Sequence, residues 1–99
     1  MTPSLPDVIS RAARGEITLL DVRELSELQT TGKAEGALHV PLSLLPLNEL
    51  PKDKPVAVYC AAGARAGQAV QHLEAKGHEA WNIGGFGHWA SAGGPVVRV

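Results

Sequence analysis

The only cysteine of the chain, Cys60, directly follows the apolar run at residues 56–59, a position suited to a nucleophile. Five residues follow it: Ala61, Ala62, Gly63, Ala64 and Arg65. The four small residues allow the backbone to curl tightly, so that successive amide N–H groups point into one cradle for an anion. Arg65 adds a permanent positive charge with a planar fork of donors. Both features lower the pKa of a thiol and favour the thiolate, which is the nucleophilic form.

The elements predicted around Cys60 agree with this interpretation. We predict a buried strand at residues 56–59 and a helix at about residues 64–76, which places Cys60 at the carboxyl end of a strand. Ligands of open parallel sheets bind at this edge. The helix would add its free N–H groups and the positive end of its dipole. A lone cysteine is more often a space-filling core residue. The order of strand, glycine loop, arginine and helix nevertheless favours a functional cysteine.

The remaining chain alternates strand-like apolar runs with helix-like segments. A helix is predicted at residues 4–14, with Ser4 as its cap, and a second buried strand at residues 17–22. Shorter elements follow, namely strands at residues 37–40 and 79–82 and a loop at residues 32–36. This alternation is typical of an α/β domain with a mainly parallel sheet. Because the chain has 99 residues and no long linker or repeat, we expect one domain over residues 1–99.

Composition argues against several functional classes. Hydrophobic residues make up 44% of the chain and charged residues 19%, which is a globular profile. Nine basic against ten acidic residues give a net charge of −1, so we expect no binding to nucleic acid or to a membrane surface. No apolar run reaches the roughly 18 residues of a membrane span. The first ten residues lack the pattern of a secretory signal, and we therefore expect a cytoplasmic protein.

The histidines show no spacing typical of a metal site. They are His39, His72, His78 and His88. None stands at metal-ligand spacing from another or from Cys60, so we expect no metal and no cofactor. We expect His72 and His78 to face solvent, and a single cysteine excludes an internal disulfide.

Four segments together match the motifs of a known family. They are residues 19–24 (LLDVRE), 32–41 (GKAEGALHVP), 60–65 (CAAGAR) and 84–89 (GGFGHW). In order and spacing, across nearly all of the chain, they resemble the rhodanese family of single-domain sulfurtransferases. Any one of these segments would be a weak signal, whereas four in order are a strong one.

The resemblance implies a rhodanese-like α/β fold, with a mainly parallel five-stranded sheet and helices on both faces. It also implies that Cys60 is the nucleophile and carries a persulfide during turnover. A donor such as thiosulfate or a persulfide would give its outer sulfur to Cys60, and cyanide, a thiol or a protein would accept it. The amides of residues 61–65 would bind the sulfur, and Arg65 would assist with its charge. Asp21 and Arg23 would support the site without acting on the substrate.

The chain departs from the family pattern at positions that bear on the donor. Ala61 and Ala62 stand where family loops often place Arg and Ser, which removes one cation and one hydroxyl donor. A neutral thiol persulfide or a protein-borne persulfide is therefore an alternative donor to thiosulfate. Lys33 replaces the usual His of the second motif and would restore some positive charge.

Other functions remain open at this point. The loss of the two polar loop residues leaves room for a non-enzymatic persulfide carrier or binding module. A phosphatase or arsenate reductase is a weaker alternative, because tyrosine phosphatases use a Cys-x5-Arg loop and the loop from Cys60 to Arg65 is one residue shorter. A purely structural domain is a third. We expect small sulfur donors and acceptors as partners, with a sulfur-relay protein as a further one, and a monomer or weak homodimer.

Overall fold

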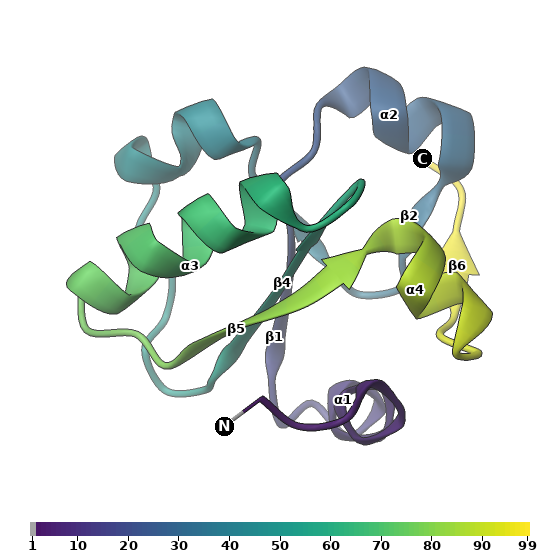
Figure 1. The fold of residues 1–99 in the computed structure, drawn as a ribbon, viewed down its shortest axis with the longest axis horizontal. Coiled ribbons are helices and arrows are strands. Elements are labelled where there is room, and N and C mark those ends of the chain that lie inside the picture. Colours follow the sequence, from purple (N-terminus) through teal and green to yellow (C-terminus); the bar gives the residue numbers. More distant parts are fainter. Residues whose placement is uncertain (1) are drawn as a thin grey trace.

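A parallel sheet forms the centre of the computed structural model, which describes residues 2–99 (Figure 1). Its strands are β1 (Thr18–Asp21), β3 (Leu38–His39), β4 (Val56–Cys60) and β5 (Ala80–Gly85). They lie in the order β3-β1-β4-β5, and all three pairings are parallel. The carboxyl ends of the strands therefore meet at one edge of the sheet. This confirms the predicted α/β class.

The sheet has four strands instead of the five that we expected. The segments β2 (Lys33–Ala34) and β6 (Val96–Val97) form a separate antiparallel pair. The loop prediction for residues 32–36 was also wrong, because β2 lies within them. Gly32, at φ +82°, turns the chain so close to β6 that an added Cβ would lie 2.6 Å from the Val97 carbonyl oxygen. Strands of two residues show no alternation that a sequence pattern could reveal.

Helices cover both faces of the sheet (Figure 1). They are α1 (Leu5–Ala13), α2 (Leu25–Thr31), the 3-10 helix η1 (Leu42–Leu47), α3 (Ala64–Ala75) and α4 (Phe86–Ser91). Helix α1 begins as predicted, because the Ser4 hydroxyl accepts the Asp7 N–H at 3.3 Å. Within residues 2–99, no helix has both the length and the apolar character needed to cross a membrane.

Alternation along β4 divides the core into two layers. Val56, Val58 and Cys60 pack with residues of α3 and η1, whereas Ala57 and Tyr59 pack with residues of α1 and α4. Every residue of this strand is buried. Full burial of each valine side chain contributes about 1.5–3 kcal/mol. Because β4 lies between two neighbouring strands and under helices on both sides, the position of Cys60 at its end is rigidly defined.

Candidate active site

The Cys60 sulfur is held by backbone amides at the carboxyl edge of the sheet. Its Sγ accepts the N–H of Gly63 at 3.0 Å and the N–H of Ala66 at 3.3 Å. Gly63 caps helix α3 with φ +106°, a backbone conformation that glycine adopts without steric cost. This turn points the amides of the loop and of the first helical turn at the sulfur. The cysteine is only 1% exposed, so a reagent approaches its sulfur past the residues of the surrounding loop.

Two opposing effects act on the thiol. Burial raises the pKa of Cys60, and hydrogen bonds from the amides of Ala66, Gly63, Ala62 and Arg65 lower it. The hydrogen bonds prevail, and the pKa of Cys60 lies below its usual value. The cradle therefore favours the thiolate. Ala66 lay outside the predicted cradle of residues 61–65, although its N–H is one of those left free in the first turn of any helix.

Strand β5 braces the cysteine loop from one side. The Asn82 Nδ2 donates to the Gly63 carbonyl oxygen at 3.0 Å, and its Oδ1 accepts the Gly84 N–H at 2.9 Å. Gly85 packs directly under the loop, where an added Cβ would collide with the Ala61 carbonyl oxygen. Asn82 was not singled out from the sequence, and Gly85 was named there only as part of the motif at residues 84–89. The loop is thus fixed by β5 as well as by α3.

The Arg65 guanidinium is paired with a carboxylate that the sequence did not single out. Its Nη1 and Nη2 donate to Glu27 Oε1 and Oε2 at 2.7 and 2.9 Å. Oε1 also accepts the N–H of Glu24 at 2.9 Å, which caps helix α2. The hydrogen bonds from Arg65, and then that from the Glu24 amide, lower the pKa of Glu27 to about 2. The pair joins α2 to α3 and neutralises the charge that we expected to act on the substrate.

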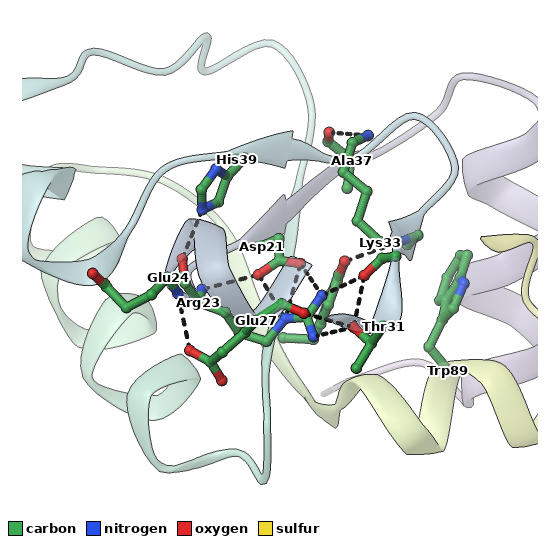
Figure 2. A network of polar contacts seen from close by, with 12 residues as sticks. Asp21, Arg23, Glu24, Glu27, Thr31, Lys33, Ala37, His39 and Trp89 are labelled. Carbon is green, nitrogen blue, oxygen red and sulfur yellow. Dashed lines mark hydrogen bonds and ion pairs between the residues drawn. The ribbon is translucent and has the colours of Figure 1, made fainter. Parts of the chain in front are cut away.

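Asp21 and Arg23 form a buried ion pair beneath α2 (Figure 2). The Asp21 carboxylate accepts the Arg23 N–H, Nε and Nη2 at 2.8–3.1 Å. Arg23 also donates to the Thr31 hydroxyl and the Gly32 carbonyl, both at 2.9 Å. Its guanidinium carbon lies 4.6 Å from the centre of the Phe86 ring. These contacts tie the end of β1 to the end of α2, and within residues 2–99 none of them joins Asp21 to the cysteine loop.

Comparison with known proteins identifies the domain. Residues 4–92 match the model of the rhodanese-like domain. The chain belongs to this family. A sulfurtransferase of Allochromatium vinosum is 37% identical over 86 residues, which cover 83% of this chain and 79% of the relative. The family and this relative support a sulfurtransferase-type function.

Solved structures agree with the assignment of this rhodanese-like domain. A rhodanese-related protein of Thermoplasma volcanium superposes with a TM-score of 0.85 at 33% identity, covering 97% of this chain and 96% of that one. A Rhodopseudomonas palustris protein described as a possible tyrosine phosphatase gives a TM-score of 0.83 at 28% identity, covering 97% and 83% of the two chains. The fold is therefore shared with proteins to which different chemistries have been attributed.

Two cavities flank the cysteine loop of the rhodanese-like domain. One, of about 390 Å³, lies between α2 and the loop and is bordered by Ala61 and Phe86. The other, of about 610 Å³, follows β5 and is bordered by Ala62 and His88. The His88 Nδ1 accepts the Gly85 N–H at 3.0 Å, so the neutral ring carries its proton on Nε2. Both cavities border the cysteine loop.

Other residues weighed from the sequence lie away from the sulfur. The Lys33 Nζ donates to the Ala37 carbonyl at 2.9 Å (Figure 2), so its charge is directed to the segment between β2 and β3 and not to the cysteine loop. His39 contacts the Arg23 carbonyl at 2.7 Å. His78 is 7% exposed, so the expectation that it faces solvent was wrong, because the chain folds back after α3. Within residues 2–99, no three His, Cys, Asp or Glu side chains are grouped as a metal site would require.

Proposed function

We propose that this domain is a sulfurtransferase that carries the transferred sulfur as a persulfide on Cys60. The observation that supports this most strongly is the pair of amide hydrogen bonds, from Gly63 and Ala66, to the cysteine sulfur. They stabilise the thiolate that attacks the donor. The remaining amides of the loop would then bind the outer sulfur of the persulfide.

The reaction is a double displacement. The Cys60 thiolate attacks the outer sulfur of the donor, the donor S–S bond breaks, and its electron pair leaves with the inner group. For thiosulfate that group is sulfite, and for a persulfide it is a thiolate. An acceptor such as cyanide or a thiol then attacks the outer sulfur of the Cys60 persulfide, and the thiolate is regenerated. The ion pair between Arg65 and Glu27 holds the cysteine loop and helix α2 in position during both displacements.

Sulfur release tests this proposal. The protein is incubated with thiosulfate or a thiol persulfide, desalted and treated with cyanide, and thiocyanate is measured per chain. We expect about one thiocyanate per chain for the wild type and none for Cys60→Ser. Equal release from the Cys60→Ser variant, or none from either protein with any donor, would contradict the proposal.

A second candidate is a persulfide carrier with slow turnover that passes its sulfur to a partner protein. The observation that favours it is the pairing of Arg65 with Glu27, which leaves no loop side chain with a free charge to activate a small donor. A carrier would retain its persulfide in the presence of cyanide and lose it to a sulfur-relay protein. Multiple-turnover kinetics with cyanide distinguish the two, because an enzyme forms thiocyanate at a linear steady state, whereas a carrier takes up one sulfur per chain and forms almost no thiocyanate.

The same pairing argues against phosphate chemistry. The carboxylate of Glu27 occupies one N–H of each outer nitrogen of Arg65 and offsets its charge, which weakens the attraction of this arginine for a phosphoryl group. We therefore expect no hydrolysis of a phosphoester and no reduction of arsenate. An assay with p-nitrophenyl phosphate checks the first expectation, and turnover that requires Cys60 would favour a phosphatase instead.

A further inference from the structure

The charged side chains that surround the cysteine loop, here called the mouth of the site, sum to a net negative charge. Arg23 and Arg65 bring two positive charges, and Asp21, Glu24 and Glu27 bring three negative ones, a net charge of −1. Both guanidinium groups are engaged, since Arg23 is 2% exposed and paired with Asp21 and Arg65 is paired with Glu27. The Cys60 thiolate adds a further negative charge. A dianion such as thiosulfate gains no net attraction from these side chains.

The cavity beside the mouth has a different chemistry. Helix α2 lines it with the hydroxyls of Ser26, Thr30 and Thr31, and the Phe86 ring forms part of its wall. The two charged residues of the lining, Arg23 and Glu27, are each engaged in an ion pair. The Thr30 and Thr31 hydroxyls both donate to backbone carbonyls. Thr31 also accepts from Arg23 and keeps one lone pair, whereas Thr30 keeps both of its lone pairs as acceptors. At about 390 Å³, the cavity is within the range that holds a small organic molecule. Its lining suits an uncharged group with hydrogen-bond donors and some apolar surface.

We propose that the donor is an organic hydropersulfide, R–S–SH, whose R group occupies the cavity between α2 and the cysteine loop, and that Glu27 sets this preference over thiosulfate. This inference rests on the proposed function and names its substrate class. The Cys60 thiolate attacks the outer sulfur, the bond between the two donor sulfurs breaks, and the inner sulfur leaves as a thiolate that takes a proton from water. Cys60 then carries the –SH. Neither an oxidant nor a reductant is required.

Glu27 acts here as a specificity-determining residue and not as a catalytic one. If its charge is removed, the mouth becomes neutral and Arg65 is free to interact with an anion. Glu27→Gln keeps the side-chain length and an oxygen to accept the Glu24 N–H. The matched control is Glu79→Gln, an equal change in charge at an exposed residue. The Glu79 carbonyl bonds to the N–H of Val56, at the opposite end of β4 from Cys60.

A second pair of variants adds a charge without disturbing the ion pair. Thr30 lines the cavity and is exposed, so Thr30→Lys places a cation at its rim. Gln29 is the preceding residue, also exposed, and does not border the cavity. Successive residues of a helix point in directions about 100° apart. Gln29→Lys therefore adds the same charge to the same helix on a different side.

The experiment measures the rate at which Cys60 gains a sulfur, by intact mass, with three donors. They are thiosulfate, the hydropersulfide of uncharged N-acetylcysteine amide and that of anionic mercaptoethanesulfonate. We expect the wild type to react fastest with the hydropersulfide whose R group is uncharged. We expect Glu27→Gln and Thr30→Lys to accelerate loading by thiosulfate by about fivefold, an effect that weakens at high salt, while the two controls stay near the wild-type rate.

The outcomes separate this inference from the proposed function. The inference is overturned if the wild type prefers thiosulfate, or if Thr30→Lys changes the thiosulfate rate no more than Gln29→Lys does. Either result leaves a working sulfurtransferase with another donor. If no donor loads Cys60 in the folded protein, the proposed function fails and the inference fails with it.

Discussion

Arg65 donates to both carboxylate oxygens of Glu27, at 2.7 and 2.9 Å, although the two residues are 38 positions apart. The contact joins the first turn of α3, which holds the Cys60 sulfur, to α2, which forms the wall of the neighbouring cavity. We therefore propose that the arginine of the Cys-x4-Arg loop acts as a positioning residue in this domain. This relationship determines both the shape of the mouth and its charge.

Because of the Glu27–Arg65 pair, we expect the stability of the fold to depend on pH in the acidic range. The pKa of Glu27 lies at about 2, below its usual value near 4.5. The pair therefore stabilises the fold above about pH 4.5, and this contribution is lost as the pH falls toward 2. Because both side chains are about one third exposed, we expect on the order of 1 kcal/mol. Urea unfolding of the wild type and Glu27→Gln at pH 7 and pH 3 measures it, and an equal difference at both pH values would contradict the account.

Asp21→Asn should destabilise the domain strongly. The change leaves the 2%-exposed Arg23 with an uncompensated charge, which costs about 3–5 kcal/mol. Chemical unfolding monitored by circular dichroism measures the loss. The control is Asp53→Asn at an exposed loop residue, for which we expect less than about 0.5 kcal/mol. A loss at Asp21 no greater than that at Asp53 would mean that the buried pair does not organise this edge of the sheet.

Gly63→Ala should weaken the sulfur cradle. Gly63 has φ +106°, so an alanine there is strained by roughly 1–2 kcal/mol or shifts the turn that aims the amides at the sulfur. We expect slower sulfur loading and a higher pKa of Cys60, measured by the pH dependence of thiol alkylation. Gly87→Ala is the matched control, because Gly87 has ordinary φ and open space around it. Unchanged loading in Gly63→Ala would show that the turn is not needed.

Alkylation of Cys60 should show the lowered pKa directly. Burial opposes the thiolate, but the amides of Ala66, Gly63, Ala62 and Arg65 outweigh it. The alkylation rate of the folded protein should therefore rise to half its maximum at a lower pH than that of the urea-unfolded protein. Since the unfolded chain binds this proton more tightly, stability increases with pH between the two pKa values. If the midpoint of the alkylation rate of the folded protein lies at or above the pH found for the unfolded chain, the conclusion that the loop amides stabilise the thiolate is wrong.

The α/β class, the strand containing Asp21, the strand leading to Cys60 and helix α3 were predictable because apolar runs and helical periodicity mark buried elements. The amide cradle could be predicted because glycine and small residues before a helix permit a tight turn. The Glu27–Arg65 ion pair and the hydrogen bonds of Asn82 to the cysteine loop were not predictable. Each depends on which distant elements the fold brings together. The β2–β6 pair was missed because two-residue strands carry no pattern.

The most direct test of the account is the intact mass of the folded protein after incubation with a sulfane-sulfur donor, with the Cys60→Ser variant beside it. The account predicts a gain of one sulfur, about 32 Da, on the wild type, removed by cyanide, and no gain on Cys60→Ser. A gain on both proteins would place the sulfur elsewhere. No gain on the folded wild type with thiosulfate or with an uncharged hydropersulfide would contradict the assignment of Cys60 as the sulfur-carrying residue.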